Sequence, residues 1–329
     1  MKYWFIILVI LIILFSCSQH EQELEIVDFK FTAITGDILL YNDGKYNAFT
    51  DLCIYRNKYY LCFRNSGAHH PVKKEDYGKI FIYESKDGDI WNKIYEVEDS
   101  TSDLRDPKLV VDKYNRLILY CGYSKLIDNE LIFQGTKAGV IDFEKKQITL
   151  QEIYKDLWLW RIAWNDEEAY SFAYRNGKVH LLKSTDGFSW FKSGNVEVEG
   201  CNESAIYFSD NKCYAIMRTV FHKTLIGCAN YPYQDWVFDT IPMEIHSPAI
   251  LYLNSAHVYC TGRVVDNAEK YTGLFKVTNS TADSVWYSSA NADQGYPGVV
   301  YKDEQVILSY YKAGDIFLKK FIAKPIYSE

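Results

Sequence analysis

The chain has 329 residues, 48% of them hydrophobic and 16% aromatic, which is enough for one large folded core or two smaller ones. Tyrosine, at 28 residues, far outnumbers methionine, at 3, and this excess favours strands over helices. The net charge of -7 argues against a general surface for nucleic acids or anionic membranes, so any anion must be bound by a local basic cluster.

The N-terminus has the pattern of an export signal. A basic start precedes the apolar run Trp4 to Phe15, which is too short to span a bilayer but suits a signal-peptide core. Leu14-Phe15-Ser16-Cys17 also resembles a bacterial lipobox, whose cysteine is acylated; the alternative is ordinary signal cleavage with Cys17 incidental. We expect residues 1–16 to be a lipoprotein signal peptide and 17–35 a tether. The protein would be exported and lipid-anchored at Cys17 in the cell envelope, at the outer membrane or cell surface.

A repeated sequence pattern runs through the rest of the chain, 36–329. Six times, an apolar strand, a polar turn and a second apolar strand follow one another, and the first strands recur every 42 to 55 residues. These first strands begin at or near Asp51, Asp106, Arg161, Glu203, Ser247 and Tyr296. A period near fifty residues predicts an all-β, six-bladed β-propeller; a pair of β-sandwiches would not need six matched hairpins.

Two seven-residue patterns fall between these hairpins. Residues 85–91 and 184–190 both read Ser-x-Asp-Gly-x-x-Trp, and 232–236 looks like a degenerate third copy. Asp-Gly supplies a tight turn, Ser and Asp can bond to its backbone, and Trp packs beneath it. The pattern resembles the Asp-box, or BNR repeat, of sialidase-type propellers, and it bears on the fold rather than on chemistry.

Seven cysteines follow Cys17, and none has metal-ligand spacing, so most are expected to be core residues. Bridges Cys53–Cys62 or Cys201–Cys213 stay open. We expect no metal and no cofactor. No heptad or apolar-helix pattern offers an interface, so the sequence does not decide the oligomeric state; a monomer is the expectation.

Arginines converge on one face. In a blade, the first strand begins and the second strand ends at the same side, so the six strand starts share one mouth. The chain has only 8 Arg, and five lie at these positions: Arg64, Arg105, Arg161, Arg218 and Arg263. A guanidinium fork holds a carboxylate bidentately, so the cluster predicts an anion site; the alternative is exposed strand-end charges or salt bridges.

Acidic, phenolic and histidine groups share that face. They include Asp51, Asp106, Glu203, Asp293 and Tyr296, and a loop at 65–78 that carries His69, His70 and Asp76. The adjacent histidines are weak metal-ligand candidates, and a loop or acid/base role fits them better.

These segments resemble the exo-sialidase (neuraminidase) superfamily over nearly all of the mature chain. Asn202-Glu203-Ser204 leading to Met217-Arg218-Thr219 looks like that family's Glu strand followed by a carboxylate-binding Arg, and Gly295-Tyr296-Pro297-Gly298 looks like its nucleophile segment. The resemblance implies Tyr296 as nucleophile and Glu203 as its base, since a phenol avoids the repulsion that a carboxylate would meet at an anomeric carbon bearing a carboxylate.

One departure concerns the first blade. Sialidases usually begin it with Phe-Arg-Ile-Pro, whose Arg completes a carboxylate-binding triad, whereas this chain reads Phe49-Thr50-Asp51-Leu52. Arg105 or Arg161 could substitute. The general acid could be Asp51, His69 or Asp76, and Asp106 in Arg-Asp-Pro resembles the acid that steadies the transition state in other propeller glycosidases.

The sequence therefore predicts an exo-glycoside hydrolase for a terminal acidic sugar on glycans, with a retaining mechanism. The catalytic candidates are Tyr296, Glu203, Asp51 and His69. The substrate-binding candidates are Arg64, Arg105, Asp106, Arg161, Arg218 and Arg263. Two alternatives remain: a surface propeller that binds acidic glycans without turnover, and a uronate-specific polysaccharide lyase. The expected partner is an acidic glycan, with no nucleic acid and no membrane contact except the lipid anchor.

Overall fold

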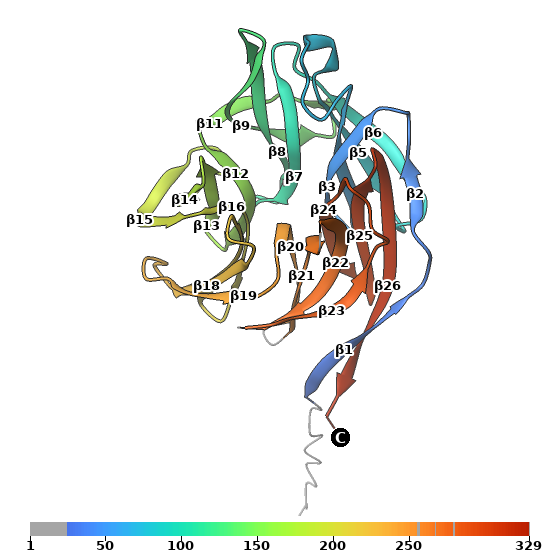
Figure 1. The fold of residues 1–329 in the computed structure, drawn as a ribbon, viewed down its shortest axis with the longest axis vertical. Coiled ribbons are helices and arrows are strands. Elements are labelled where there is room, and N and C mark those ends of the chain that lie inside the picture. The colour runs from blue at the N-terminus through green and yellow to red at the C-terminus, as the bar shows by residue number, and fades with distance from the viewer. Residues whose placement is uncertain (1–24, 255–256, 267, 279, 329) are drawn as a thin grey trace, which may run out of the picture.

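A computed structural model describes residues 25–254, 257–266, 268–278 and 280–328. The proposed signal peptide, Cys17 and the first part of the tether lie outside the described residues. Six antiparallel sheets stand around a common axis, as Figure 1 shows, so the protein is a six-bladed β-propeller. Within the described part of the chain, no helix is long and apolar enough to cross a membrane.

Each blade is built from consecutive strands, counted from the axis outward. The inner strands are β3 (Tyr46–Tyr55), β7 (Asp103–Val111), β12 (Trp158–Asn165), β16 (Cys201–Ser209), β20 (Ile245–Asn254) and β24 (Gln294–Lys302). The second strands are β4 (Lys58–Ser66), β8 (Leu117–Ile127), β13 (Glu168–Arg175), β17 (Lys212–Thr219), β21 (His257–Asp266) and β25 (Gln305–Lys312). Neighbouring inner strands contact one another around the axis and close the ring.

The third strands are β5 (Lys79–Ser85), β9 (Glu130–Asp142), β14 (Lys178–Ser184), β18 (Thr224–Asn230), β22 (Glu269–Val277) and β26 (Asp315–Tyr327). The outer strands are β6 (Asn92–Val97), β10 (Gln147–Ile148), β11 (Gln151–Lys155), β15 (Phe191–Glu199), β19 (Val237–Ile241) and β23 (Ala282–Tyr287), with β1 (Ile26–Ala33) and β2 (Ile38–Tyr41) in the last blade. A short 3₁₀ helix, η1 (Lys74–Asp76), lies in the loop after β4.

The ring is closed by pairing the two ends of the chain. Strand β1 pairs antiparallel with β26, with Thr32 opposite Ile322, and so completes the blade that the C-terminal strands begin. Figure 1 shows β1 and β26 side by side. Strand β1 falls inside the stretch 17–35 that was expected to be a tether, so the propeller starts ten residues earlier than the expected boundary at 36.

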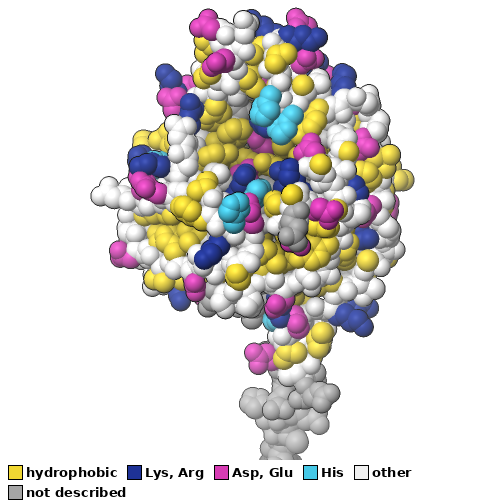
Figure 2. Space-filling model, in the orientation of Figure 1, with side chains coloured by type: hydrophobic (Ala, Val, Ile, Leu, Met, Phe, Trp, Pro, Cys, Tyr) yellow, Lys and Arg dark blue, Asp and Glu magenta, His cyan; other side chains and the backbone are white. Residues whose placement is uncertain are grey.

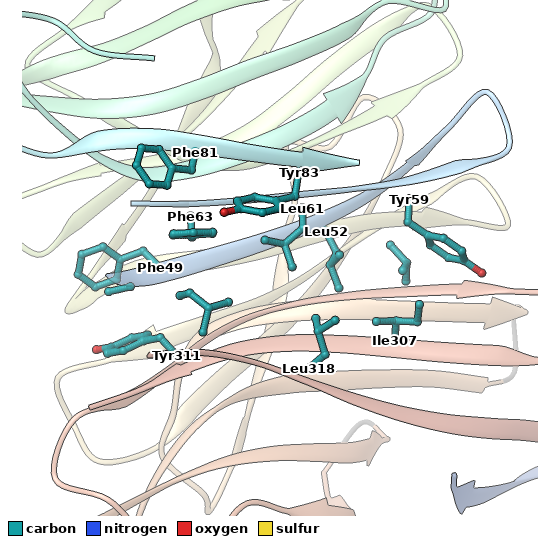
Figure 3. Close-up of a cluster of buried hydrophobic side chains, with 13 residues drawn as sticks. Phe49, Leu52, Tyr59, Leu61, Phe63, Phe81, Tyr83, Ile307, Tyr311 and Leu318 are labelled. Carbon is teal, nitrogen blue, oxygen red and sulfur yellow. The ribbon is translucent and has the colours of Figure 1, made fainter. Parts of the chain in front are cut away.

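The core lies between blades rather than within one. Six clusters of buried side chains each join two neighbouring sheets, one cluster for every blade interface. Figure 3 shows the interface of the first and sixth blades, where Phe49, Leu61 and Phe63 face Ile307 and Leu318. A single sheet leaves its apolar faces exposed until a neighbour stacks on it, which is why the repeat is stable only as a closed set. The seven described cysteines, including the pairs Cys53–Cys62 and Cys201–Cys213, are free thiols.

The Ser-x-Asp-Gly-x-x-Trp patterns form matching turns between the third and fourth strands. In the second of them, the Asp186 carboxylate accepts hydrogen bonds from the backbone N–H groups of Phe188 and Ser189, both at 2.7 Å. Trp190 Nε1 donates to the Gly187 carbonyl at 3.0 Å, and Gly187 has a φ of 81°. This left-handed conformation requires glycine to avoid strain. The 232–236 copy keeps the same bond from Trp236 to Tyr233.

Asp186→Ala should lower the free energy of unfolding by about 1–2 kcal/mol, because two backbone donors lose their acceptor. Chemical denaturation followed by tryptophan fluorescence measures this loss. Asp283→Ala, which removes an exposed carboxylate of β23, is the control and should leave the midpoint unchanged. Equal midpoints for both variants would contradict the structural role of the turn.

Candidate active site

All six inner strands bulge at the same height. The pairing between the first and second strands shifts register between Ala48 and Asp51 in the first blade. The equivalent shift occurs in each of the five remaining blades. The bulged pairs are Phe49-Thr50, Asp106-Pro107, Trp160-Arg161, Asn202-Glu203, Ser247-Pro248 and Tyr296-Pro297. A bulge interrupts the ladder and re-aims a side chain, so these positions form a ring around the axis at one end of the propeller, here called the mouth.

Left-handed backbone marks four of these bulges. Phe49, Asp106, Ser247 and Tyr296 have φ values of 61°, 49°, 45° and 49°. Such values are costly for side chains larger than glycine and cluster at functional sites in proteins. Figure 2 shows a hollow in one face of the molecule in which basic, acidic and histidine side chains meet, flanked by apolar surface.

A phenol and a carboxylate meet at the mouth. The Tyr296 hydroxyl donates to Glu203 Oε1 at 2.6 Å. The same carboxylate accepts the backbone N–H of Ser247 at 2.7 Å on Oε2 and contacts Arg218 Nη1 at 3.1 Å. Glu203 is therefore held by side chains or backbone from the fourth, fifth and sixth blades.

The proton of this pair stays on the phenol. Burial raises the pKa of Tyr296 well above its ordinary value, and the negative charge of Glu203 raises it further. Burial also acts to raise the pKa of Glu203, but the Arg218 guanidinium and the hydrogen bond from Tyr296 outweigh it and keep this pKa below its ordinary value. Glu203 is thus ionised and positioned to accept the phenol proton.

Arg263 covers the phenol ring. Its guanidinium carbon lies 4.8 Å from the centre of the Tyr296 ring, a cation–π geometry. Its Nε donates to the Gln294 carbonyl, and its Nη2 donates to the Tyr311 hydroxyl at 2.7 Å. The Tyr311 hydroxyl in turn donates to Asp293 at 2.6 Å. These contacts fix the guanidinium over the ring.

Arg105 is fixed over the Phe49 ring of the first-blade bulge. Its guanidinium carbon lies 4.8 Å from the Phe49 ring centre, and its Nη1 donates to the His69 carbonyl at 3.2 Å. His69 also bonds to Arg105 through Nε2 and to the Tyr46 hydroxyl through Nδ1, the latter at 3.2 Å. Burial and the Arg105 charge lower the pKa of His69 to about 4, so the imidazole is neutral and orients Arg105.

The five mouth arginines differ in their access to a ligand. The Arg218, Arg105 and Arg263 side chains are 28%, 13% and 11% exposed, respectively. Arg64, by contrast, is fully buried, and its three nitrogens donate to protein oxygens, including Asp103 at 2.7 Å. This burial argues against the substrate-binding role expected for Arg64.

The side chains of Asp51, which follows the first-blade bulge, and Arg161, which belongs to the third-blade bulge, meet at an inner cavity near the axis. Arg161 Nη1 contacts Asp51 Oδ1 at 2.7 Å, and both line a 140 Å³ cavity together with Lys108. Asp51 is only 3% exposed and also accepts the backbone N–H of Leu109 at 2.9 Å. These contacts of the Asp51 carboxylate argue against the general-acid role that the sequence had suggested. The Arg161 side chain is 17% exposed, but its three nitrogens donate to Asp51 and to two backbone carbonyls, which argues against the suggested substrate-binding role. Asp76 lies in η1 and pairs with Lys73 at 3.8 Å.

The Asp106 carboxyl group has a raised pKa. Burial raises its pKa to about 6, against the lowering influence of Arg105 and Lys108, while the charge of Glu203 adds to the rise. Its Oδ1 is buried without a hydrogen-bond partner, and its Oδ2 lies 3.6 Å from Arg105 Nε. A carboxyl group with this pKa can exchange a proton near neutral pH.

Other polar atoms at the bulges also lack protein partners. Trp160 Nε1, His246 Nδ1 and Ser247 Oγ are buried and unpaired, as is Asp106 Oδ1. Buried polar groups are normally hydrogen-bonded, so these four atoms carry a desolvation cost. The sequence analysis did not single out Trp160, His246 or the aromatic rings of Phe49 and Tyr311. The residue-Pro pairs at three of the bulges were visible in the sequence as a repeated signal.

The sequence matches no protein-family model and no curated protein. Among solved structures, a protein of unknown function from Dyadobacter fermentans superposes with a TM-score of 0.75 at 16% identity, covering 92% of this chain and 100% of that one. Trypanosoma rangeli sialidase in complex with sialic acid gives a TM-score of 0.58 at 11% identity, covering 89% of this chain and 58% of that one. A structure described as NanB plus optactamide gives 0.58 at 10% identity, covering 88% and 70%.

These likenesses show the fold: the chain is a six-bladed propeller of the sialidase type. It spans little more than half of the trypanosomal sialidase.

Asp106→Asn should change how stability depends on pH. The pKa of Asp106 is raised on folding, so wild-type stability is fully present below its ordinary pKa and falls as pH rises through about 6. The variant lacks that fall and should be more stable than wild type at about pH 8, by on the order of 2–3 kcal/mol, but not at about pH 4. Urea denaturation at both pH values measures the difference. A variant that gains no relative stability between the two pH values would contradict the burial of a carboxylate that Arg105 compensates only in part.

Proposed function

We propose that the protein is a retaining exo-glycosidase that removes a terminal sugar bearing a carboxylate on its anomeric carbon, sialic acid or a related 2-keto acid sugar, from glycans. The observation that supports this most directly is the 2.6 Å hydrogen bond from Tyr296 to the ionised Glu203 beneath two arginines. A neutral phenol approaches such a carbon without the repulsion that an anionic nucleophile meets.

Three arginines serve the substrate carboxylate in this proposal. Arg218 is the most open of them, Arg263 lies over the nucleophile, and Arg105 replaces the missing first-blade arginine from the second blade. Their positive charges sit in a partly desolvated mouth, where they stabilise the anionic substrate and the charge that develops in the transition state.

The reaction then proceeds in two displacements. Glu203 accepts the phenol proton as the Tyr296 oxygen bonds to the anomeric carbon, and the bond to the leaving oxygen breaks. Asp106 fits the role of proton donor to that oxygen, since it carries a pKa of about 6 and one unpaired oxygen. A water molecule, deprotonated by Asp106, then displaces Tyr296, which recovers its proton from Glu203.

One observation favours an alternative, a glycan-binding propeller without turnover. In the first-blade bulge, Thr50, a buried neutral residue, stands where the family's motif has arginine. This alternative expects the purified protein to bind acidic glycans and release no sugar from them, whereas an unsaturated product absorbing in the ultraviolet would indicate a lyase instead.

Tyr296→Phe should reduce sugar release by at least about a thousand-fold while leaving the fold and glycan binding intact, because only the attacking oxygen is lost. The assay screens monosaccharides released from sialylated, Kdo-containing and uronate-containing glycans and repeats the measurement with the substrate that wild type hydrolyses. Tyr114→Phe, which alters an exposed tyrosine, is the matched control and should retain full activity. Normal turnover by Tyr296→Phe would rule out the phenol as nucleophile.

A further inference from the structure

The guanidinium of Arg161 links four blades at the centre of the propeller. Arg161 belongs to the third blade, and its Nε donates to the Pro248 carbonyl of the fifth blade at 2.8 Å. Its Nη2 donates to the Pro297 carbonyl of the sixth blade at 2.8 Å, and its Nη1 donates to Asp51 of the first blade at 2.7 Å. Each nitrogen therefore bonds to a different blade.

The two carbonyls are available because both strands bulge there. The pairing of β20 with β21 skips from His246 to Ala249, and that of β24 with β25 skips from Gly295 to Gly298. Pro248 and Pro297 lie within these gaps and outside the regular ladder pairing. A buried carbonyl needs a donor, and the Arg161 fork supplies one to each of the two.

Both carbonyls directly follow a residue of the candidate active site. Pro297 follows Tyr296, whose own carbonyl accepts the Thr50 hydroxyl at 3.0 Å. Pro248 follows Ser247, whose N–H donates to Glu203 Oε2 at 2.7 Å. One planar group thus fixes the backbone that carries the phenol and the backbone that orients its carboxylate partner.

Arg161 has little capacity left for a substrate. Its charge is compensated by Asp51, which is 3% exposed, and three of its nitrogens are already used. The guanidinium fork is rigid, so the separation of the two carbonyls that it bridges is defined. Displacements of about 1 Å at a reacting pair can cost on the order of a hundred-fold in rate.

We infer that Arg161 is a positioning residue of the proposed hydrolase: it holds the bulges at 247–248 and 296–297 so that Tyr296 and Glu203 stay in hydrogen-bond contact, and it does not bind the substrate carboxylate. The expected effect of Arg161 on kcat rests on the proposed function, whereas its effect on the position of Tyr296 does not.

The test compares Arg161→Lys and Arg161→Met with wild type on the substrate found in the glycan screen. Lysine keeps a positive charge beside Asp51 but cannot reach both carbonyls. The lysine variant therefore serves as the folded test case if the methionine variant fails to fold. We expect kcat to fall by at least about thirty-fold in either variant with KM within about threefold of wild type. Arg116→Met is the matched control, since Arg116 also pairs with a carboxylate, Asp112, and donates to a carbonyl, at the other end of the propeller.

A second measurement does not depend on turnover. Fluorotyrosine placed at position 296 reports the surroundings of the phenol by ¹⁹F NMR, and its resonance should shift or broaden in Arg161→Lys but not in Arg116→Met. An unchanged kcat, or a raised KM at constant kcat, would overturn the positioning role. If wild type releases no sugar at all, the proposed function fails, and the ¹⁹F resonance alone decides whether Arg161 sets the position of Tyr296.

Discussion

The candidate site depends on a bulge repeated in all six inner strands. In a regular strand, successive side chains point to opposite faces of the sheet and pack between blades. The bulge breaks that alternation at one height in every blade, so a ring of side chains turns toward the axis instead. Because the same irregularity frees backbone carbonyls, the centre also needs donors, and Arg161 and Lys108 provide them.

The ring of bulges also explains how the charged side chains of the mouth are paired. Carboxylates and guanidinium groups that are brought out of water are stable only when paired, which is why Glu203 is held by Arg218 and Asp51 by Arg161. Asp106 is less completely compensated, and its pKa rises accordingly. Partly compensated groups of this kind are enriched at functional sites, and here Asp106 contributes to the electrostatic environment of the Tyr296 phenol.

Much of the architecture could be predicted from the sequence because a propeller repeats its signals. The spacing of six hairpins predicted the six-bladed fold, which is confirmed, and the positions of the arginines predicted one shared mouth. The sequence could not show that Arg64 is fully buried, since a strand end exposes or buries its last side chain according to the neighbouring blade. Nor could it show that Asp51 and Arg161 pair with each other, because a break in strand alternation changes which residues face the axis.

Strand β1 illustrates a similar limit. Its polar and apolar residues have no hairpin partner nearby in the sequence, because the partner, β26, lies at the other end of the chain. His69 likewise looked like an acid or base from its position in a loop, whereas its contacts with Tyr46 and Arg105 make it a neutral orienting group. In both examples, contacts between residues far apart in the sequence determine the structural role.

The most direct measurement is covalent trapping of the nucleophile. A 2-keto acid sugar carrying fluorine at the anomeric carbon and at the adjacent carbon slows the second displacement more than the first, so the protein should accumulate as an aryl glycoside in which the Tyr296 oxygen bonds to the anomeric carbon. Peptide mass spectrometry should then find one added sugar on Tyr296. An adduct on another residue, or rapid hydrolysis of the natural substrate with no adduct on Tyr296, would contradict the proposed role of this phenol.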